Sequence, residues 1–468
     1  MGSILVLTVG AAVAAYAFSR SLLRFSQDPR EPPAAKTTIP FISPLLGFIQ
    51  GMPNYLVTLR DEYHLPMYTL RMPGQRVYVV NSLPLISVLQ RQNKTIAFAP
   101  IQAQAAAAVM GVGPADNAII GSEQMLEHES YLSTFTSSIP PGLSPGPGLD
   151  ELNGAAIRYI SDSLAAMYGP KNPFRSAGLE QAWYDFEPCI VVHMLKAWPS
   201  VLARKSLKAR EDGIIPAFGR YYAQHGHHQG SLLAQCQFQH NIDHGLRGRN
   251  VAATDVGHLV ASLTNSVGSA FWLVYHVFSD PSRGKRIRNS CPLLLSTWQE
   301  TLRYVHIGIA ARVFIQDVML DDQYLLKIGA TDMTAAPVQH TDEAACDSTV
   351  GKLDHRRFLQ AGDKKRRNPA AFRPFGGGTV LCPGRHFVST EVMSFVALLL
   401  LRFDLRPVNK DGKWVAAPRK GYPMTSSMPT PKDKMNVEIL PRDQRQWRVT
   451  FPATSNGVDV TAEDAANG

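Results

Sequence analysis

The feature that constrains this chain most is a cysteine, Cys382, that lies between a glycine-rich loop and a long apolar stretch. The loop, 375–381, contains three consecutive glycines, and the apolar stretch, 388–401, predicts a helix. Glycine lets the backbone bulge and approach a flat ligand closely, and Pro383 suits the first helical position because that position needs no N–H donor. A thiolate at a helix N-terminus is stabilised by the helix dipole and nearby amides. The segment predicts an ionised cysteine able to bind ferric iron, against the plainer alternative of a buried free cysteine.

The overall composition excludes few classes of partner. The chain has 468 residues, of which 45% are hydrophobic, so we expect it to fold. Its formal net charge of +9 suits a nucleic acid, an anionic membrane or an acidic protein partner, and charge alone does not choose among them. The cysteines are odd in number and widely spaced, which predicts no disulfide framework and favours a reducing compartment.

The N-terminus predicts attachment to a membrane. Residues 4–19 carry no charge and are followed by Arg20 and Arg24. A membrane anchor at 1–24 is the favoured interpretation, although it is slightly shorter than the ~20 apolar residues of a comfortable span, and a cleaved signal peptide is the alternative. The basic residues after the apolar run would hold that flank in the cytoplasm. The rest of the chain divides into a proline-rich hinge at 25–44, a folded body at 45–452 and a disordered tail at 453–468.

The cysteine segment matches a known family signature. Phe375, Gly378, Cys382 and Gly384 fill every fixed position of Phe-x-x-Gly-x-x-x-Cys-x-Gly, and in this the chain resembles the cytochrome P450 family. The resemblance implies a mainly α fold with a small β-sheet region and a single haem domain at 45–452, in which Cys382 is the axial ligand of the iron of haem b (iron protoporphyrin IX). It also implies that Phe375 packs beside the sulfur, that Gly378 permits a bulge, and that Gly384 lets the helix approach the porphyrin.

Two further motifs of the family lie upstream of the cysteine. Glu300 and Arg303 match its Glu-x-x-Arg, in which residues on one helix face form a buried ion pair. Arg357 lies in a segment that resembles the family's Pro-x-Arg-Phe and would complete this structural ion pair, although His355 stands where the proline is usual. Val380 replaces a basic residue that often meets a haem propionate, so Arg312, in a predicted strand at 310–318, becomes the candidate for that contact.

The predicted helix at 259–278 resembles the one that crosses the haem face in the family. Most members carry an acid and an alcohol at its centre, whereas this chain has no acid between Leu263 and Trp272. The pattern of an asparagine followed by Phe-Trp resembles the branch that contains sterol 7α-hydroxylases and prostacyclin synthase. Asn265, Ser266 and Ser269 are therefore the candidate catalytic residues, because their side chains can order water for proton delivery. Gly268 would open a groove or a kink over the iron.

The resemblance implies a membrane-anchored, fungal-type monooxygenase in the endoplasmic reticulum, with its catalytic domain in the cytosol. We expect it to hydroxylate a lipophilic secondary metabolite, such as a terpenoid or steroid, with O2 and with electrons from NADPH–cytochrome P450 reductase. A partner is required because Gly111 and Gly113 begin a nucleotide-binding pattern that lacks its third glycine. No nucleic-acid partner is implied.

Three alternatives stay open. The first is a haem-thiolate isomerase or dehydratase that rearranges a peroxide without external electrons. The second is a non-catalytic haem or metal-binding membrane protein. The third is a zinc site, because His240 and His244 have the i, i+4 spacing that can chelate a metal.

Overall fold

The computed structural model describes residues 2–92, 94–158, 163–194, 196, 198–359, 368–419, 426–445, 458–461 and 464. Their contacts divide the chain into two compact units, each made of segments that are separate in sequence. Unit 1 contains Met1–Phe98, Ile307–Gly351 and Arg367–Val380, and unit 2 contains Ala99–His306, Lys352–Arg366 and Leu381–Gly468.

Unit 1 is built on a five-stranded sheet with the order β1-β2-β7-β4-β3. Its strands are β1 (Met67–Met72), β2 (Gln75–Val80), β3 (Ile96–Ala97), β4 (Ile309–Phe314) and β7 (Thr331–Ala335). β1 and β2 form an antiparallel hairpin, and its turn contains Gly74, whose φ of 70° is one that glycine adopts without strain. β2 pairs parallel with β7, and β7 pairs antiparallel with β4. A separate two-stranded ribbon joins β5 (Val318–Leu320) to β6 (Tyr324–Leu326).

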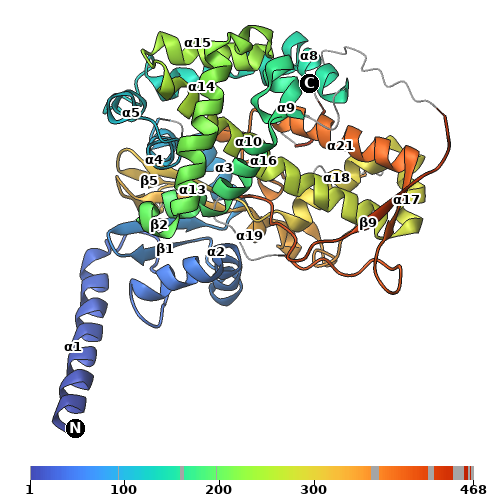
Figure 1. Cartoon of the computed structure of the whole chain (residues 1–468). Coiled ribbons are helices and arrows are strands. Elements are labelled where there is room, and N and C mark those ends of the chain that lie inside the picture. Colours follow the sequence, from blue (N-terminus) through green and yellow to red (C-terminus); the bar gives the residue numbers. More distant parts are fainter. Residues whose placement is uncertain are drawn as a thin grey trace. The chain divides into compact units, whose positions relative to one another are not determined.

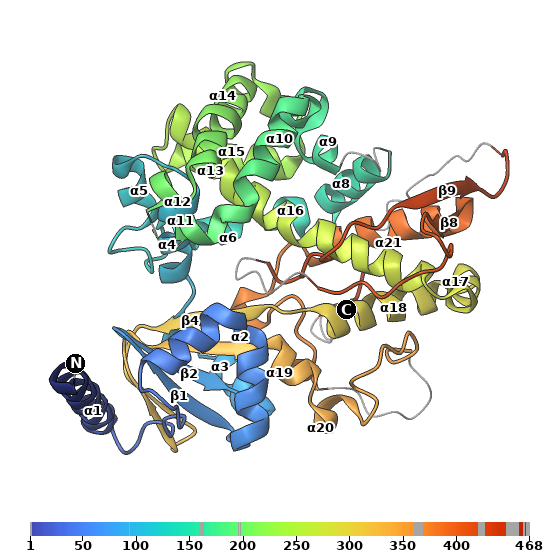
Figure 2. The same cartoon turned by 60° about the horizontal axis from the view of Figure 1, so that its bottom comes forward.

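Helices and 3-10 turns complete unit 1 (Figure 2). They are α2 (Ile42–Tyr63), α3 (Leu83–Gln90), α19 (Ala336–His340), α20 (Glu343–Cys346) and the 3-10 turns η6 (Pro369–Ala371) and η7 (Gly378–Val380). Alternate residues of the strands enter two apolar clusters, one with Met67, Tyr78 and Phe314 and the other with Tyr68, Leu70 and Val79. The sheet is therefore covered on both faces.

Helix α1 (Gly2–Ser26) extends away from the sheet of unit 1 (Figure 1). Its span Val6–Ser26 is long and apolar enough to cross a membrane, by length and composition. The helix ends two residues beyond the predicted anchor, and Arg76 of β2 donates to the carbonyl of Ser26 at 3.0 Å. This hydrogen bond from the sheet fixes the end of the helix, and the predicted hinge therefore begins at a residue whose backbone is bound to the sheet.

Unit 2 is almost entirely helical (Figure 1). Its longer helices are α4 (Ala99–Val109), α8 (Pro147–Arg158), α10 (Ala177–Phe186), α14 (Ile215–Ala223), α15 (Leu232–Asp243), α16 (Arg249–Phe278), α18 (Cys291–Val305) and α21 (Arg385–Arg402). Its shorter helices and turns are α5 (Pro114–Ile120), α6 (Tyr131–Ser138), α7 (Pro140–Leu143), α9 (Ser163–Tyr168), η1 (Gly169–Lys171), η2 (Pro173–Arg175), η3 (Glu187–Cys189), α11 (Ile190–Met194), α12 (Pro199–Leu202), α13 (Arg204–Lys208), η4 (Ala209–Ile214), η5 (Gly226–Gln229) and α17 (Pro281–Arg288). β8 (Phe403–Pro407) and β9 (Val437–Pro441) form one antiparallel ribbon.

The long helix α16 is the axis of unit 2. Its N-terminal half is buried, with Val251, Val256 and Leu259 in a cluster that also takes in Trp183 and Phe218 from other helices. Its C-terminal half packs against both α18 and α21. A mainly helical chain with a small mixed sheet confirms the predicted fold class.

Candidate active site

Cys382 lies three residues before α21, and its side chain is only partly buried. Burial raises the pKa of its thiol, while the backbone N–H groups of Gly384 and Arg385 and the Arg385 charge act in the opposite direction. A methyl group on Gly384 would lie 3.9 Å from the Cys382 Sγ, so glycine leaves one side of the sulfur uncovered. A cysteine sulfur with amide donors and a cation beside it is a donor set that fits the iron of a haem, since a coordinated thiol is held as the thiolate.

The loop before the cysteine needs glycine at two positions. Gly376 and Gly378 have φ values of 80° and 60°, in the left-handed region. A methyl group on Gly376 would meet the Val380 carbonyl oxygen at 2.9 Å, and one on Gly378 would meet Gln90 of α3 at 3.2 Å. Gly378 therefore sits at a tight bend, as its place in the signature implies. Gly376, which sequence reasoning did not single out, is under the same constraint, and Phe375 beside it is half-buried.

Glu300 binds two arginines in the interior of unit 2. Its Oε2 accepts from the Arg303 Nε at 2.7 Å and its Oε1 from the Arg303 Nη2 at 2.8 Å. The Arg357 Nε lies 3.1 and 3.0 Å from the two carboxylate oxygens. Glu300 is 0% exposed and the arginines 2% and 7%. The structure thus brings together all three residues of the ion pair expected from the sequence.

The backbone around Arg357 completes this arrangement. The amide of Asp354 donates to the Glu300 Oε1 at 2.9 Å, and the Lys352 carbonyl accepts from the Nη2 atoms of Arg303 and Arg357 at 3.4 and 3.1 Å. A turn closes between the Asp354 carbonyl and the Arg357 amide at 3.0 Å. The chain can therefore form this turn with His355 in place of proline.

Arg312 lies on β4, where its side chain is buried beside Asp332 of β7. The two residues are register partners across the strands, and the Asp332 Oδ2 accepts from the Arg312 Nε at 3.2 Å and Nη2 at 2.9 Å. Burial raises the pKa of Asp332, and Arg312 opposes that shift. Sequence reasoning missed Asp332, because nothing local links residues twenty positions apart. One edge of the guanidinium is thus fixed, and the propionate contact remains a prediction for the other.

The centre of α16 is continuous helix, so Gly268 does not kink it. A methyl group on Gly268 would lie 3.1 Å from the Met428 Cβ, and Met428 is buried. The glycine therefore lets the segment 426–429 approach α16 closely. The predicted kink is wrong, because an uninterrupted helix with a close neighbour explains the glycine.

Asn265 and Trp272 both form hydrogen bonds to the backbone of the segment 426–429. The Asn265 Oδ1 accepts from the Ser427 amide at 2.7 Å, and the Trp272 Nε1 donates to the Pro429 carbonyl at 2.7 Å. Residues 265, 268 and 272 lie on one face of the helix, since they are three and four positions apart. Sequence reasoning missed the 426–429 segment, because no local pattern marks it.

The two serines of α16 differ in their surroundings. Ser269 is buried, and its Oγ donates to the Asn265 carbonyl at 2.8 Å, which satisfies the hydroxyl within its own helix. Ser266 is half-exposed, and its hydroxyl has no partner among the residues that the structure describes. Asn265 and Ser269 therefore have side-chain hydrogen bonds to described residues, and the Ser266 hydroxyl has none.

The histidines of the zinc alternative are engaged by the protein. The Nε2 atoms of His240 and His244 lie 3.1 and 3.0 Å from the Thr134 Oγ1, and the ring of Tyr131 packs against both. Burial lowers the pKa of His240 to about 4. Within the described ranges, no group of three His, Cys, Asp or Glu side chains is placed to hold a metal ion. These residues therefore serve as packing and hydrogen-bonding groups.

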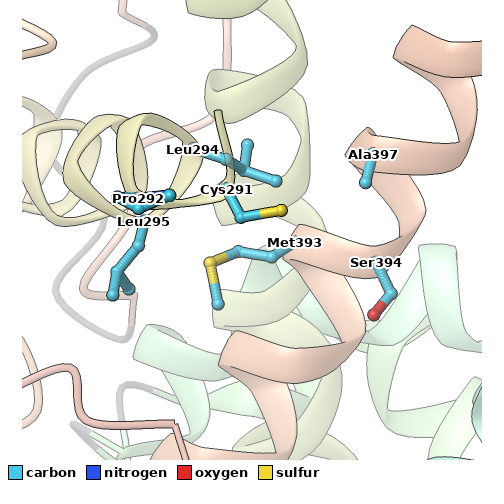
Figure 3. Close-up of a pocket in the computed structure, with 7 residues that line it drawn as sticks. All are labelled: Cys291, Pro292, Leu294, Leu295, Met393, Ser394 and Ala397. Carbon is cyan, nitrogen blue, oxygen red and sulfur yellow. The ribbon is translucent and has the colours of Figure 1, made fainter. Parts of the chain in front are cut away.

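An apolar pocket lies between α18 and α21, lined by Cys291, Pro292, Leu294, Leu295, Met393, Ser394 and Ala397 (Figure 3). Cys291 is exposed there, and all five cysteines of the chain are free thiols. The lining contains no acid or base that would activate this thiol. The pocket therefore adds no second reactive centre, and it supplies an exposed cysteine for comparison with Cys382.

A mainly helical chain with a cysteine at the start of a long helix has the architecture of a haem-thiolate protein, and comparisons with known proteins identify which kind. The cytochrome P450 family model matches residues 284–437. Among the relatives, a cytochrome P450 monooxygenase named nodJ from Hypoxylon pulicicidum is 29% identical, over 91% of this chain and 94% of its own length. A cytochrome P450 monooxygenase of Gibberella zeae is 23% identical, over 88% of each chain.

A relative from the sterol hydroxylases is also found. The 5-beta-cholestane-3-alpha,7-alpha-diol 12-alpha-hydroxylase of Sus scrofa is 23% identical, over 88% of this chain and 92% of its own length. The fungal and sterol-hydroxylase resemblances predicted from the sequence are both confirmed. This chain resembles cytochrome P450 monooxygenases along most of its length and is an oxygenase enzyme with a cytochrome P450 domain at 284–437, a domain whose family carries a haem-thiolate iron.

Proposed function

We propose that this monooxygenase hydroxylates a lipophilic small molecule, a terpenoid, a steroid or a similar secondary metabolite, with electrons from NADPH–cytochrome P450 reductase. The observation that carries the proposal is the Cys382 thiol beside the first turn of α21, with amide donors and a cation next to it. The name of the Sus scrofa relative, a hydroxylase of a cholestane diol, supports a lipophilic substrate.

Haem b is the cofactor that we assign to this site. Cys382 would hold its iron, Phe375, Gly378 and Gly384 would accommodate the ring, and Arg312 would bind a propionate. When bound, a haem with a thiolate ligand supplies the activation of dioxygen, because the thiolate favours O–O cleavage. The Glu300, Arg303 and Arg357 cluster would hold the surrounding backbone in place and take no direct part.

The residues of α16 would supply protons to the oxygen chemistry. Asn265 holds the 426–429 segment through its Oδ1, and its Nδ2 has no partner among the described residues. We infer that this fixed amide orients a water molecule next to the Ser266 hydroxyl, and that the water passes protons inward. Ser269 would support the relay by fixing the helix backbone at Asn265.

The test of the function uses the purified full-length holoenzyme with a steroid and terpenoid panel. With reductase and NADPH, we expect a hydroxylated product from at least one panel member and none without NADPH. Conversion of a lipid hydroperoxide at equal rates with and without NADPH, and no hydroxylation of the panel, would favour the isomerase or dehydratase instead. A holoenzyme whose haem spectrum responds to no panel member would favour a binding protein.

Asn265→Ala is expected to uncouple electron consumption from product formation. The substitution removes the acceptor for the Ser427 amide and the group that orients water, so more reduced oxygen should leave as hydrogen peroxide. The measurement is product formed per NADPH consumed, which we expect to fall, because losing one proton-transfer or orienting group typically slows the step that it serves by ~100-fold or more. Asn289→Ala, at the exposed end of α17, is the matched control. Unchanged coupling in Asn265→Ala would show that the residue has only a structural role.

We propose that α1 anchors the enzyme in the endoplasmic reticulum membrane with the remaining chain in the cytosol. Val9→Arg combined with Val13→Arg should move the protein from the membrane to the soluble fraction, because each arginine at mid-helix costs ~2.5–3.5 kcal/mol on insertion. Both valines are exposed in α1, at 56% and 63%. Val408→Arg with Val415→Arg, at exposed valines of unit 2, is the control for added charge. Membrane retention of the α1 variant after carbonate washing would contradict the anchor.

A further inference from the structure

Part of the C-terminal segment, residues 458–461 and 464, packs against the helix that follows Cys382. The Val458 carbonyl lies 3.1 Å from the His386 Nδ1, and the Val460 carbonyl accepts from the Gln299 Nε2 at 2.8 Å. Val460 is 1% exposed and Asp464 5%. The segment is thus held to α21 through His386 and to α18 through Gln299. The other residues of the predicted tail, 453–457, 462–463 and 465–468, lie outside the described residues.

Asp464 is fixed by its own chain before it meets α21. The Asp464 Oδ2 accepts from the amide and the hydroxyl of Thr461, at 2.9 Å each, while the Asp464 amide donates to the Thr461 Oγ1 at 3.3 Å. This reciprocal exchange has the geometry of a capping box, which orients both side chains. The Val460 amide adds a bond to the same oxygen at 3.1 Å. The Asp464 Oδ2 is therefore bonded within its own segment, and the Oδ1 is left to bind a group outside it.

The second oxygen of Asp464 binds Arg385 in the first turn of α21. The Arg385 Nε donates to the Asp464 Oδ1 at 2.7 Å, and the Arg385 Nη1 donates to the Cys382 carbonyl at 3.1 Å. The ion pair is shielded from solvent, since the side chains are 17% and 1% exposed. Burial alone would raise the pKa of Asp464, but the Thr461 amide and Arg385 lower it overall, so Asp464 is ionised at neutral pH. A fixed negative charge thus lies two hydrogen bonds from the cysteine backbone.

We propose that Asp464 is a positioning residue for the thiolate site: it binds Arg385, fixes the guanidinium on the Cys382 carbonyl, and offsets a positive charge that would otherwise act on the sulfur. This inference rests on the proposed role of Cys382 as the haem ligand. Groups just outside the ligand shell tune a bound metal through charge and hydrogen bonding. An arginine paired at contact distance has a weak field at long range, whereas an unpaired one has a full charge in a low-dielectric interior.

The experiment is a spectroelectrochemical titration of the purified, substrate-free holoenzyme. Asp464→Asn keeps the size of the side chain and removes its charge, which should favour the more negatively charged ferrous state. At a fixed potential, the ferrous-to-ferric ratio should rise about threefold to tenfold, where tenfold corresponds to ~59 mV for one electron. Asp464→Glu should restore most of the wild-type value.

Two comparisons isolate the route through Arg385. Asp459→Asn makes the same charge change at an exposed position of the same segment and should leave the potential unchanged. In an Arg385→Gln background, Asp464→Asn should shift the potential much less than in wild type, because the Arg385 charge that Asp464 offsets is already absent. If Asp464→Asn yields too little protein, Thr461→Ala, which removes one hydrogen bond to the carboxylate and one from the Asp464 amide, should give a smaller shift in the same direction.

Equal potentials in Asp464→Asn, Asp459→Asn and wild type would overturn the proposal, as would an equal effect of Asp464→Asn with and without Arg385. The ferrous–carbonyl spectrum separates this failure from that of the proposed function. If the wild-type protein lacks a thiolate-type spectrum, Cys382 is not the haem ligand. If the spectrum is normal but Asp464→Asn leaves the potential unchanged, only the proposed role of Asp464 is contradicted.

Discussion

Cys382→Ser should abolish the far-red-shifted Soret band of the ferrous–carbonyl complex and all NADPH-dependent turnover. Only a thiolate ligand gives haem that band, and a serine hydroxyl at the start of α21 is too weakly acidic to replace it. The loss should be complete, because the substitution removes the ligand itself. The measurement is a carbon-monoxide difference spectrum of the purified protein, with haem content determined separately.

Cys291→Ser is the matched control for this change. Cys291 is an exposed thiol in the pocket of Figure 3, at the start of α18, so the same replacement there tests for any general effect of losing a cysteine. We expect a wild-type spectrum and wild-type turnover. A Cys382→Ser protein that kept both the thiolate spectrum and its activity would contradict the assignment of Cys382 as the haem ligand.

Glu300→Gln should prevent stable folding of unit 2 or reduce it severely. Glutamine keeps the shape of the side chain, but it removes the negative charge that Arg303 and Arg357 both bind, and each arginine is under a tenth exposed. Breaking a buried ion pair from one side typically costs ~3–5 kcal/mol, a large share of the ~5–15 kcal/mol that stabilises a native domain. We expect little soluble protein, poor haem incorporation and a melting temperature well below that of wild type.

The control for Glu300→Gln is Glu151→Gln, the same chemical change on the exposed face of α8. Surface substitutions of this kind usually alter stability by less than ~0.5 kcal/mol. Expression, haem content and melting temperature should match wild type in this variant. If Glu300→Gln also had the expression, haem content and melting temperature of wild type, the Glu300 cluster would contribute no more to stability than an ordinary surface ion pair.

Several features could be predicted because their information is local. The glycines, the cysteine and the apolar run that becomes α21 are contiguous, so the segment contains both the start of the helix and the cysteine beside it. Glu300 and Arg303 are three residues apart, and this spacing alone places them on one face of a helix. The hairpin of β1 and β2 and the apolar helix α1 follow from alternation, a turn glycine and composition. Arg357 came from the resemblance to the family alone.

The sequence by itself indicated the family resemblance, the cysteine and the main helices, because periodicity and short motifs record which residues are neighbours along the chain. Only the tertiary structure decided the partners of the key polar groups: Asp332 for Arg312, the Ser427 amide for Asn265, and Asp464 for Arg385. The same holds for the two units, each assembled from segments far apart in sequence. The physical reason is that a hydrogen bond between residues 20, 162 or 79 positions apart depends on how packed elements place their side chains, and no local pattern encodes that placement.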